Sequence, residues 1–120
     1  MEIVVSATEP HLEAQVDPRF GRSSYFLLVN PESMEYKVLT NGQNLRTAQG
    51  AGIQAAALVA RHRPAAVLTG NCGPKAFQTL QAAGISVVVG VEGSVRDAVQ
   101  NYQAGKFQPA PGPNVASHWR

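Results

Sequence analysis

Residues 65–69, Ala-Ala-Val-Leu-Thr, form an almost wholly apolar run of strand length between two segments of helical periodicity. A run that is apolar on both faces is typical of a central strand covered by helices. A further β-rich run occupies residues 85–89, after the second helical segment. Strand–helix–strand units join parallel neighbours through right-handed crossovers, so the second half of the chain predicts parallel pairing.

The first half of the chain predicts strands without helices. Residues 3–7 and 25–29 are β-rich and are separated by a long loop, residues 8–23. Residues 35–39 follow after a turn of about four residues, which predicts an antiparallel hairpin. Their polar and apolar residues alternate, as on an edge strand with one face in water. Together the two halves predict a ribonuclease H-like α/β fold. Its mixed five-stranded sheet has order 3-2-1-4-5, the first three strands antiparallel, and helices cover both faces.

The three helical segments have recognisable ends. The first opens at Gly50 and stops before a proline, and its expected inward face is Ile53, Ala56, Ala57 and Ala60. The second has Pro74 at its first position and Gly84 as a left-handed cap. The third starts at Ser94, with Asp97 three residues later as a variant capping box.

Composition limits the function classes. The 120 residues are 44% apolar and 15% charged, so we expect one globular domain over residues 1–107 and an irregular, proline-rich tail over 108–120. The net charge is only +2 and no Lys/Arg run occurs, which argues against a nucleic-acid or membrane-surface partner. A single cysteine excludes an internal disulfide or a four-cysteine metal site. No signal peptide or bilayer-length apolar run is present, so we expect a cytoplasmic protein.

Known catalytic patterns are missing. A ribonuclease H-like nuclease needs clustered carboxylates, including one on the first strand, yet that strand has only Glu2 at its edge. His62 lies at the far end of the first helix, so no spacing pairs a histidine with Cys72 as base and nucleophile. Gly50-Ala51-Gly52 follows a polar loop rather than a strand, and its nucleotide-binding signal is weak. We therefore expect a protein that is not an enzyme.

The candidate site is one end of the sheet, where loops follow the parallel strands and helices begin. Helix N-termini have unpaired N–H groups and a partial positive charge, which suit an anion. A thiol at such a position is expected to have a lowered pKa and to be a soft-metal ligand. Arg19 and Arg22 add cations, with Gly21 between them as a flexible joint. The candidate binding residues are Arg19, Phe20, Gly21, Arg22, Gly50, Gly52, Asn71, Cys72, Gly73 and Ser94, and the candidate metal ligands are Cys72 and His11.

Plainer structural roles stay open for these residues. Gly70 and Gly73 can serve only a tight turn, with Cys72 as a small buried filler. The arginine loop can be a solvated loop held by an aromatic anchor, Phe20. His11 can be an ordinary exposed loop residue.

Several motifs together resemble the dinitrogenase iron–molybdenum cofactor biosynthesis family over residues 1–107. They are Asp17-Pro18-Arg19-Phe20-Gly21-Arg22 with Tyr25-Phe26, Gly50-Ala51-Gly52-Ile53-Gln54-Ala55-Ala56, Gly70-Asn71-Cys72-Gly73-Pro74-Lys75-Ala76, Gly84-Ile85, Gly93-Ser94-Val95-Arg96-Asp97-Ala98 and Tyr102-Gln103-Ala104-Gly105. The resemblance implies a ribonuclease H-like fold without nuclease residues, and a small carrier or chaperone for molybdenum-containing metal–sulfide clusters. As a free-standing domain, the chain is similar to the orange protein branch, which holds a molybdenum–copper sulfide cluster without covalent attachment.

The resemblance implies a cargo and a way of holding it. The expected cargo is a molybdenum–copper sulfide cluster, or alternatively the iron–molybdenum cofactor or a precursor. Helix N-termini at Gly50, Gly73 and Ser94, with both arginines, would bind the anion, while Phe20 would shield it and Cys72 would touch copper or iron. Expected partners are a P-loop ATPase or a cluster acceptor, and the chain is expected to be a monomer or weak homodimer. Two alternatives are a small-anion or nucleotide-binding module, and an interaction protein that pairs through its third strand.

Overall fold

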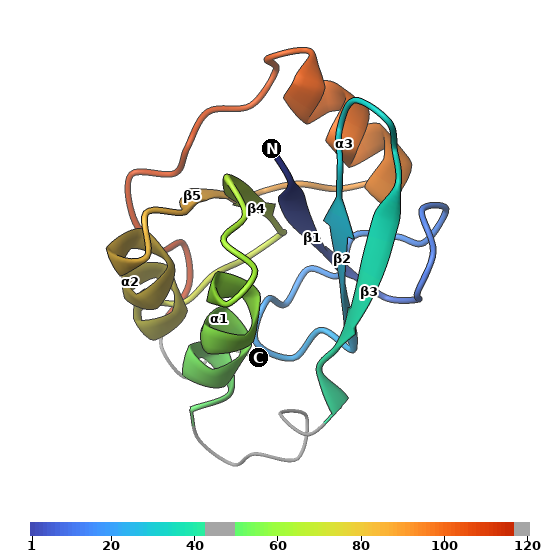
Figure 1. The fold of residues 1–120 in the computed structure, drawn as a ribbon. Helices are drawn as coiled ribbons and strands as arrows, with labels where there is room; N and C mark the ends of the chain where they lie inside the picture. The colour runs from blue at the N-terminus through green and yellow to red at the C-terminus, as the bar shows by residue number, and fades with distance from the viewer. Residues whose placement is uncertain (43–49, 117–120) are drawn as a thin grey trace.

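A five-stranded sheet of order β3-β2-β1-β4-β5 forms the centre of the molecule (Figure 1). In this computed structural model residues 1–42 and 50–116 are described. β1 pairs antiparallel with β2 and parallel with β4, β2 pairs antiparallel with β3, and β4 pairs parallel with β5. The predicted order and directions are confirmed. The strands are β1 Ile3–Ala7, β2 Tyr25–Val29, β3 Tyr36–Thr40, β4 Ala66–Leu68 and β5 Ser86–Val88.

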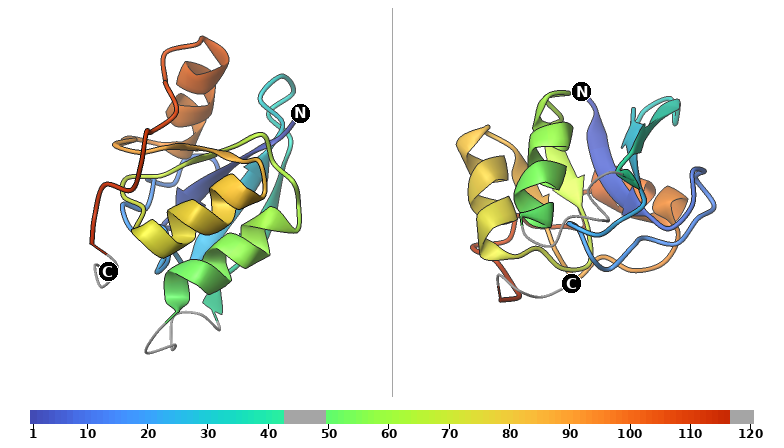
Figure 2. Two further views of the ribbon diagram at one scale, coloured as in Figure 1. Left: turned by 90° about the vertical axis from the view of Figure 1, so that its left-hand side faces the viewer. Right: turned by 90° about the horizontal axis from the view of Figure 1, so that it is seen from below.

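Helices cover both faces of the sheet, as predicted. α1 (Ala51–Ala60) and α2 (Pro74–Ala82) lie side by side on one face, and α3 (Val95–Gln103) covers the other (Figures 1 and 2). Alternate residues of each strand therefore enter two separate hydrophobic cores: Val5 packs under α3, and Val4 packs under α1 and α2. Among the described residues, no helix is long and apolar enough to cross a membrane.

The helix ends agree with the sequence. Pro74 occupies the start of α2, and Gly84 has a φ of 78° after its end. Ser94 caps α3 by accepting a hydrogen bond from the Asp97 N–H at 3.1 Å. These residues fix where α2 and α3 begin, which in turn fixes the loops in front of them.

The predicted inward face of α1 is correct for Ala56 and Ala60, which pack in or against the core, and wrong for Ile53 and Ala57. Ile53 is 41% exposed, and Ala57 is exposed as well. α1 contains so many alanines that its apolar residues do not mark one side. Packing against α2 decides the face, because only small residues allow the two helices to approach closely. The buried residues are Ala51, Ala55, Ala56 and Val59.

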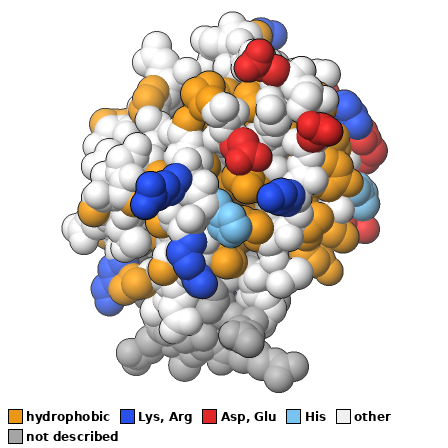
Figure 3. Space-filling model, in the orientation of Figure 1, with side chains coloured by type: hydrophobic (Ala, Val, Ile, Leu, Met, Phe, Trp, Pro, Cys, Tyr) orange, Lys and Arg blue, Asp and Glu red, His pale blue; other side chains and the backbone are white. Residues whose placement is uncertain are grey.

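β3 is an edge strand, but its apolar residues are not covered as the alternation predicted. Tyr36 is 40% exposed and Val38 38% exposed. They lie on the α3 side of the sheet, beside Val29 and Leu27 of β2. α3 packs mainly over β1, and it leaves these two side chains partly open to solvent. Figure 3 accordingly shows hydrophobic side chains at the surface over β3.

The chain after α3 crosses the opposite edge of the sheet. Phe107 packs against the core under α3, whereas Ala110 packs against the core under α1 and α2. Between the two cores, the Ala110 N–H donates to the Val87 carbonyl at 2.7 Å. This segment therefore lies along the outer side of β5.

Candidate functional site

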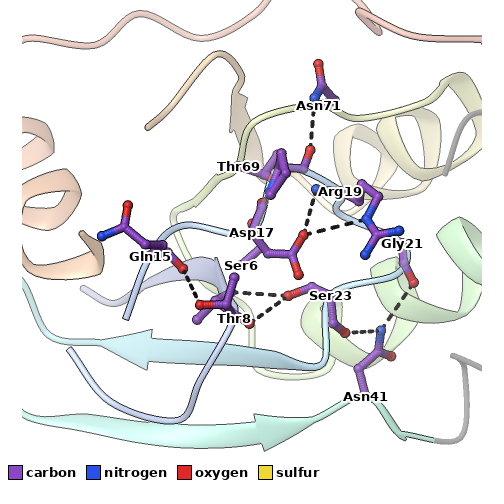
Figure 4. Close-up of polar contacts among 12 residues, drawn as sticks. Ser6, Thr8, Gln15, Asp17, Arg19, Gly21, Ser23, Asn41, Thr69 and Asn71 are labelled. Carbon is purple, nitrogen blue, oxygen red and sulfur yellow. Dashed lines mark hydrogen bonds and ion pairs between the residues drawn. The ribbon is translucent and has the colours of Figure 1, made fainter. Parts of the chain in front are cut away.

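The predicted site residues come from loops at one end of the sheet. Loops 8–24, 69–73 and 89–94 follow the parallel strands β1, β4 and β5, and the helices begin beside them. The carboxyl ends of parallel strands are where ligands bind in open α/β sheets. The first of these loops contacts the other two, at Asn71 and at Ser94. Figure 4 shows the contact with Asn71.

The loop after β1 contacts α3 through its first half. Gln15 forms an isolated β-bridge with Ser94, and the Val16 N–H donates to the Gly93 carbonyl at 2.8 Å. The Ser94 hydroxyl already caps its own helix, so it is occupied in the structure. Ser94 thus lies at the predicted end of the sheet, next to Gln15 rather than next to the arginines.

The second half of the same loop lies against the loop after β4. Arg19 forms a parallel bridge with Asn71, and the Phe20 N–H donates to the Asn71 carbonyl at 3.2 Å. The Asn71 side-chain amide donates in return to the Pro18 carbonyl at 3.0 Å (Figure 4). Arg19 and Asn71, which are far apart in sequence, are therefore held side by side.

Gly21 seats this loop directly on the start of α1. A Cβ at residue 21 would lie 3.0 Å from both Cα and N of Gly52. The expectation that Gly21 is a flexible joint is wrong: its missing side chain allows two backbones to touch. Gly50, with a φ of 76°, turns the chain into α1. The loop carrying Arg19 and Arg22 therefore lies against the N-terminal end of α1.

The N-termini of α1 and α2 differ from that of α3. Gly50 and Gly73 hold their N-cap positions and have no side chain that could cap the helix. The first N–H groups of a helix have no partner within the helix. The first turns of α1 and α2 also contain no acidic residue that would repel an anion, whereas the first turn of α3 contains Asp97. The anion-binding potential is therefore concentrated at α1 and α2.

A buried hydrogen-bond network that sequence reasoning missed supports the loop. The Ser6 hydroxyl oxygen lies 2.7 Å from the Asp17 carbonyl oxygen and 2.8 Å from Thr69 Oγ1. The Ser23 hydroxyl bonds to both the N–H and the carbonyl of Ala7. Asn41, at the end of β3, donates to the Ser23 carbonyl at 2.8 Å (Figure 4). The signal for this network was Ser6 and Thr69, two polar residues in otherwise apolar central strands.

Asp17 is a buried carboxylate within this loop. Only 6% of the residue is exposed. Its Oδ1 accepts the Arg19 N–H at 2.9 Å, and Arg19 Nε is 4.0 Å away. Burial raises the pKa of the Asp17 carboxyl, against the opposing effects of the Arg19 N–H and guanidinium. The Asp17-Pro18-Arg19 motif thus forms a turn that the hydrogen bond from the Arg19 N–H to the Asp17 carboxylate stabilises.

Cys72 does not have the reactivity predicted for it. The residue is 1% exposed, and its Sγ lies 3.8 Å from the Gly73 carbonyl oxygen. Burial raises the pKa of the Cys72 thiol to about 12, so the thiol is protonated at neutral pH. The expected lowered pKa is wrong, because the side chain enters the core beneath α1 and α2 instead of facing the end of α2. The plainer role, a small buried filler, describes this geometry.

Phe20 is likewise a core residue. It is 1% exposed, and its ring centroid lies 5.1 Å from that of Phe26. Its side chain therefore anchors the arginine loop to the sheet and has almost no surface with which to shield a ligand.

His11 and Cys72 are placed against different helices. His11 lies 3.5 Å from Glu9, and its neighbour Leu12 accepts the Arg96 N–H of α3. Cys72 precedes α2. Over residues 1–42 and 50–116 there is no group of three or more His, Cys, Asp or Glu side chains that could hold a metal ion. The described side chains offer cations and N–H donors rather than a set of metal ligands.

Asn114, in the proline-rich tail, is a further residue of this end of the sheet that sequence reasoning did not single out. Its Oδ1 accepts the Cys72 N–H at 2.8 Å, and its own N–H donates to the Cys72 carbonyl at 3.1 Å. Its side-chain amide donates to the Asn71 Oδ1 at 2.9 Å and to the Gly70 carbonyl at 3.3 Å. No periodic pattern marks such a contact, since it comes from a single side chain in an irregular segment.

Known proteins are similar to this chain in sequence and in fold. Residues 1–105 match the family described as dinitrogenase iron–molybdenum cofactor. The apo orange protein of Desulfovibrio gigas has a structure with a TM-score of 0.92 and 44% identity, covering 95% of this chain and 96% of that one. A structure of a NifB-like protein from Thermotoga has a TM-score of 0.76 and 26% identity, covering 90% and 91%. An uncharacterized protein of Methanocaldococcus jannaschii is 28% identical over 101 residues, 78% of this chain and 81% of its own length.

Proposed function

The chain belongs to the dinitrogenase iron–molybdenum cofactor family, and from this premise we propose that it carries an anionic, molybdenum-containing metal–sulfide cluster. The observation that carries the proposal is the contact between the arginine loop and the start of α1, where Gly21 meets the backbone of Gly52. Arg19 and Arg22 flank Gly21 in this loop, which supports a role for both cations beside the N-terminus of α1. Cations and N–H groups that have no partner in their own helix suit a multiply charged, sulfide-faced anion.

The residues present fit a cluster held without covalent bonds. Cys72 is buried and protonated, and the described residues contain no group of three metal-ligating side chains. N–H groups at the starts of α1 and α2 can donate to sulfide, and the guanidinium groups can balance its charge. The cluster is then a cargo recognised by its charge and shape, and the protein performs no chemical step on it.

The finer proposal is a molybdenum–copper sulfide cluster, with the iron–molybdenum cofactor or a precursor as the alternative. It is supported by 44% identity to the orange protein of Desulfovibrio gigas over nearly the whole chain. We propose that the carrier works in the cytoplasm as a monomer or weak homodimer and delivers its cargo to an acceptor protein.

The test is a titration of the apo-protein with tetrathiomolybdate and copper(I), followed by desalting, a visible spectrum and metal analysis. Molybdenum and copper retained together in a fixed ratio, with new charge-transfer bands, would support the carrier. If the desalted protein contains neither metal, the molybdenum–copper proposal fails. Competition by inorganic phosphate would favour a general anion or nucleotide module instead.

A second candidate is an interaction protein that binds a partner through β3. The observation in its favour is that Tyr36 and Val38 are exposed on an edge strand, whose outer N–H and carbonyl groups can pair with another sheet. A P-loop ATPase or the cluster acceptor would be such a partner. Replacing Val38 by Lys should abolish this binding and leave cluster retention unchanged, because Val38 lies beside Leu27 on the α3 side of the sheet, opposite to α1 and α2.

A further inference from the structure

The segment after α3 does more than cover the edge of β5, because it ends in four hydrogen bonds to the loop in front of α2. Asn114 uses its backbone N–H, its side-chain oxygen and its side-chain N–H groups, all toward residues 70–72. No other described residue of the tail makes a comparable set of polar contacts. The tail lies beyond residues 1–105, which match the family.

Asn114 also determines how the Asn71 amide is oriented. The Asn71 Oδ1 accepts a hydrogen bond from Asn114 Nδ2 at 2.9 Å, so its own N–H group faces the other way. That group donates to the Pro18 carbonyl at 3.0 Å, immediately before Arg19. A chain of hydrogen bonds thus runs from Asn114 through Asn71 to the loop that carries the arginines.

The segment is built to reach this position in one conformation. Pro111 and Pro113 restrict the backbone between the two attachment points, Pro109 restricts it just before the first, and all three lower the entropy lost on ordering the segment. The first attachment is the bond between Ala110 and Val87, and the second is Asn114. Asn114 is therefore held where its side chain meets Asn71.

We propose that Asn114 is a positioning residue of the cluster site: through Asn71 it holds the arginine loop in place against the starts of α1 and α2. The expected effect of Asn114 on cargo binding rests on the proposed carrier function. The expected effect of Asn114 on the position of the arginine loop concerns the apo-protein alone. The tail is then a component of the site that residues 1–105 do not contain.

Two variants of Asn114 separate positioning of Asn71 from simple attachment of the tail. Asn114→Ala removes all three side-chain contacts. Asn114→Asp can still accept the Cys72 N–H, but its carboxylate has no donor and would face the Asn71 Oδ1 and the Gly70 carbonyl. Gln108→Ala is the matched control, because Gln108 is an exposed amide of the same tail.

The first measurement is amide hydrogen exchange and chemical shift in the apo-variants. We expect the Cys72 N–H to exchange roughly three- to tenfold faster in Asn114→Ala, the factor that one net hydrogen bond represents. Both Asn114 variants should shift the Arg19 and Phe20 amides, and Gln108→Ala should shift neither. Unchanged Arg19 and Phe20 amides in both variants would overturn the inference.

The second measurement is retention of tetrathiomolybdate with copper(I) after desalting. We expect both Asn114 variants to retain less molybdenum and copper than the wild type. The double variant Asn71→Ala/Asn114→Ala should retain as much metal as Asn71→Ala alone, because Asn114 acts through Asn71. Wild-type retention in Asn114→Asp would overturn the positioning role and leave the carrier proposal intact. If the wild type itself retains no metal, the carrier proposal fails, and the cargo part of this inference fails with it.

Discussion

Gly70 and Pro18 touch through their backbones. A Cβ at residue 70 would lie 2.7 Å from the Cα of Pro18 and 3.0 Å from its carbonyl oxygen. The contact joins the end of β4 to the arginine loop, next to the bonds between Asn71 and residues 18–20. Residue 70 therefore has to be glycine for the two loops of the site to meet.

Gly70→Ala should accordingly be destabilising, because the neighbouring atoms are backbone and cannot give way without moving the loop. We expect a loss of about 1–3 kcal/mol in the free energy of unfolding, as for overpacked sites. Gly112→Ala is the control, since a Cβ there meets nothing within 4 Å. Urea unfolding of the two variants checks this, and equal stability would show that the loop yields easily.

The sheet could be predicted because each of its features is encoded locally. An apolar run such as residues 65–69 predicts a central strand from its own residues alone. Pro74, Gly84 and Ser94 likewise predict helix ends, because each residue suits the backbone conformation or hydrogen bonding of a helix terminus. Right-handed crossovers then leave few arrangements of the strands. The helix N-termini at the site follow directly from this topology.

Side-chain direction could not be predicted in the same way. Cys72 stands just before a helix, where a thiol facing the N-terminus would be acidic, but its Sγ enters the core and its pKa rises instead. Phe20 and the face of α1 depend equally on what packs against them. Asn114 is an isolated side chain far along the sequence, and only the folded tail brings it to Asn71.

Charge reversal of the arginines should weaken cargo binding. Arg19→Glu and Arg22→Glu each replace a cation beside α1 by an anion, so we expect the retained molybdenum to fall at least severalfold, and more so at low ionic strength. Arg61→Glu makes the same change just after the opposite end of α1, on an exposed residue. It should retain as much metal as the wild type. Equal loss in all three variants would indicate a nonspecific effect of net charge.

Removal of the Asp17 charge should leave the fold at least as stable at neutral pH. Burial raises the pKa of this carboxyl, so its contribution to stability is fully present below the unfolded pKa of about 3.9 and is lost as the pH rises through the folded pKa. Asp17→Asn keeps an oxygen acceptor for the Arg19 N–H, which Asp17 binds at 2.9 Å.

The measurement for Asp17 is urea unfolding of wild type and Asp17→Asn at pH 3 and pH 7. We expect the stability of Asp17→Asn relative to the wild type to be higher at pH 7 than at pH 3. Glu32→Gln, at an exposed carboxylate in the turn before β3, is the control. The opposite result, a relative stability of Asp17→Asn that is lower at pH 7 than at pH 3, would mean that the attraction of the Asp17 carboxylate to Arg19 outweighs the effect of its burial.

Cys72 should make the protein sensitive to alkali without being needed for cargo. Because its folded pKa is raised to about 12, the thiol stabilises the fold fully below the unfolded pKa, and this contribution is lost as the pH rises toward the folded pKa. With an unfolded pKa of about 8.5, the loss at pH 10 is about 2 kcal/mol. Cys72→Ala should lose correspondingly less stability between pH 7 and pH 10 than the wild type in urea unfolding. The same variant should still retain molybdenum and copper, because the protonated thiol lies in the core. Complete loss of both metals in a folded Cys72→Ala protein would instead make ligation by the thiolate the dominant contribution to binding.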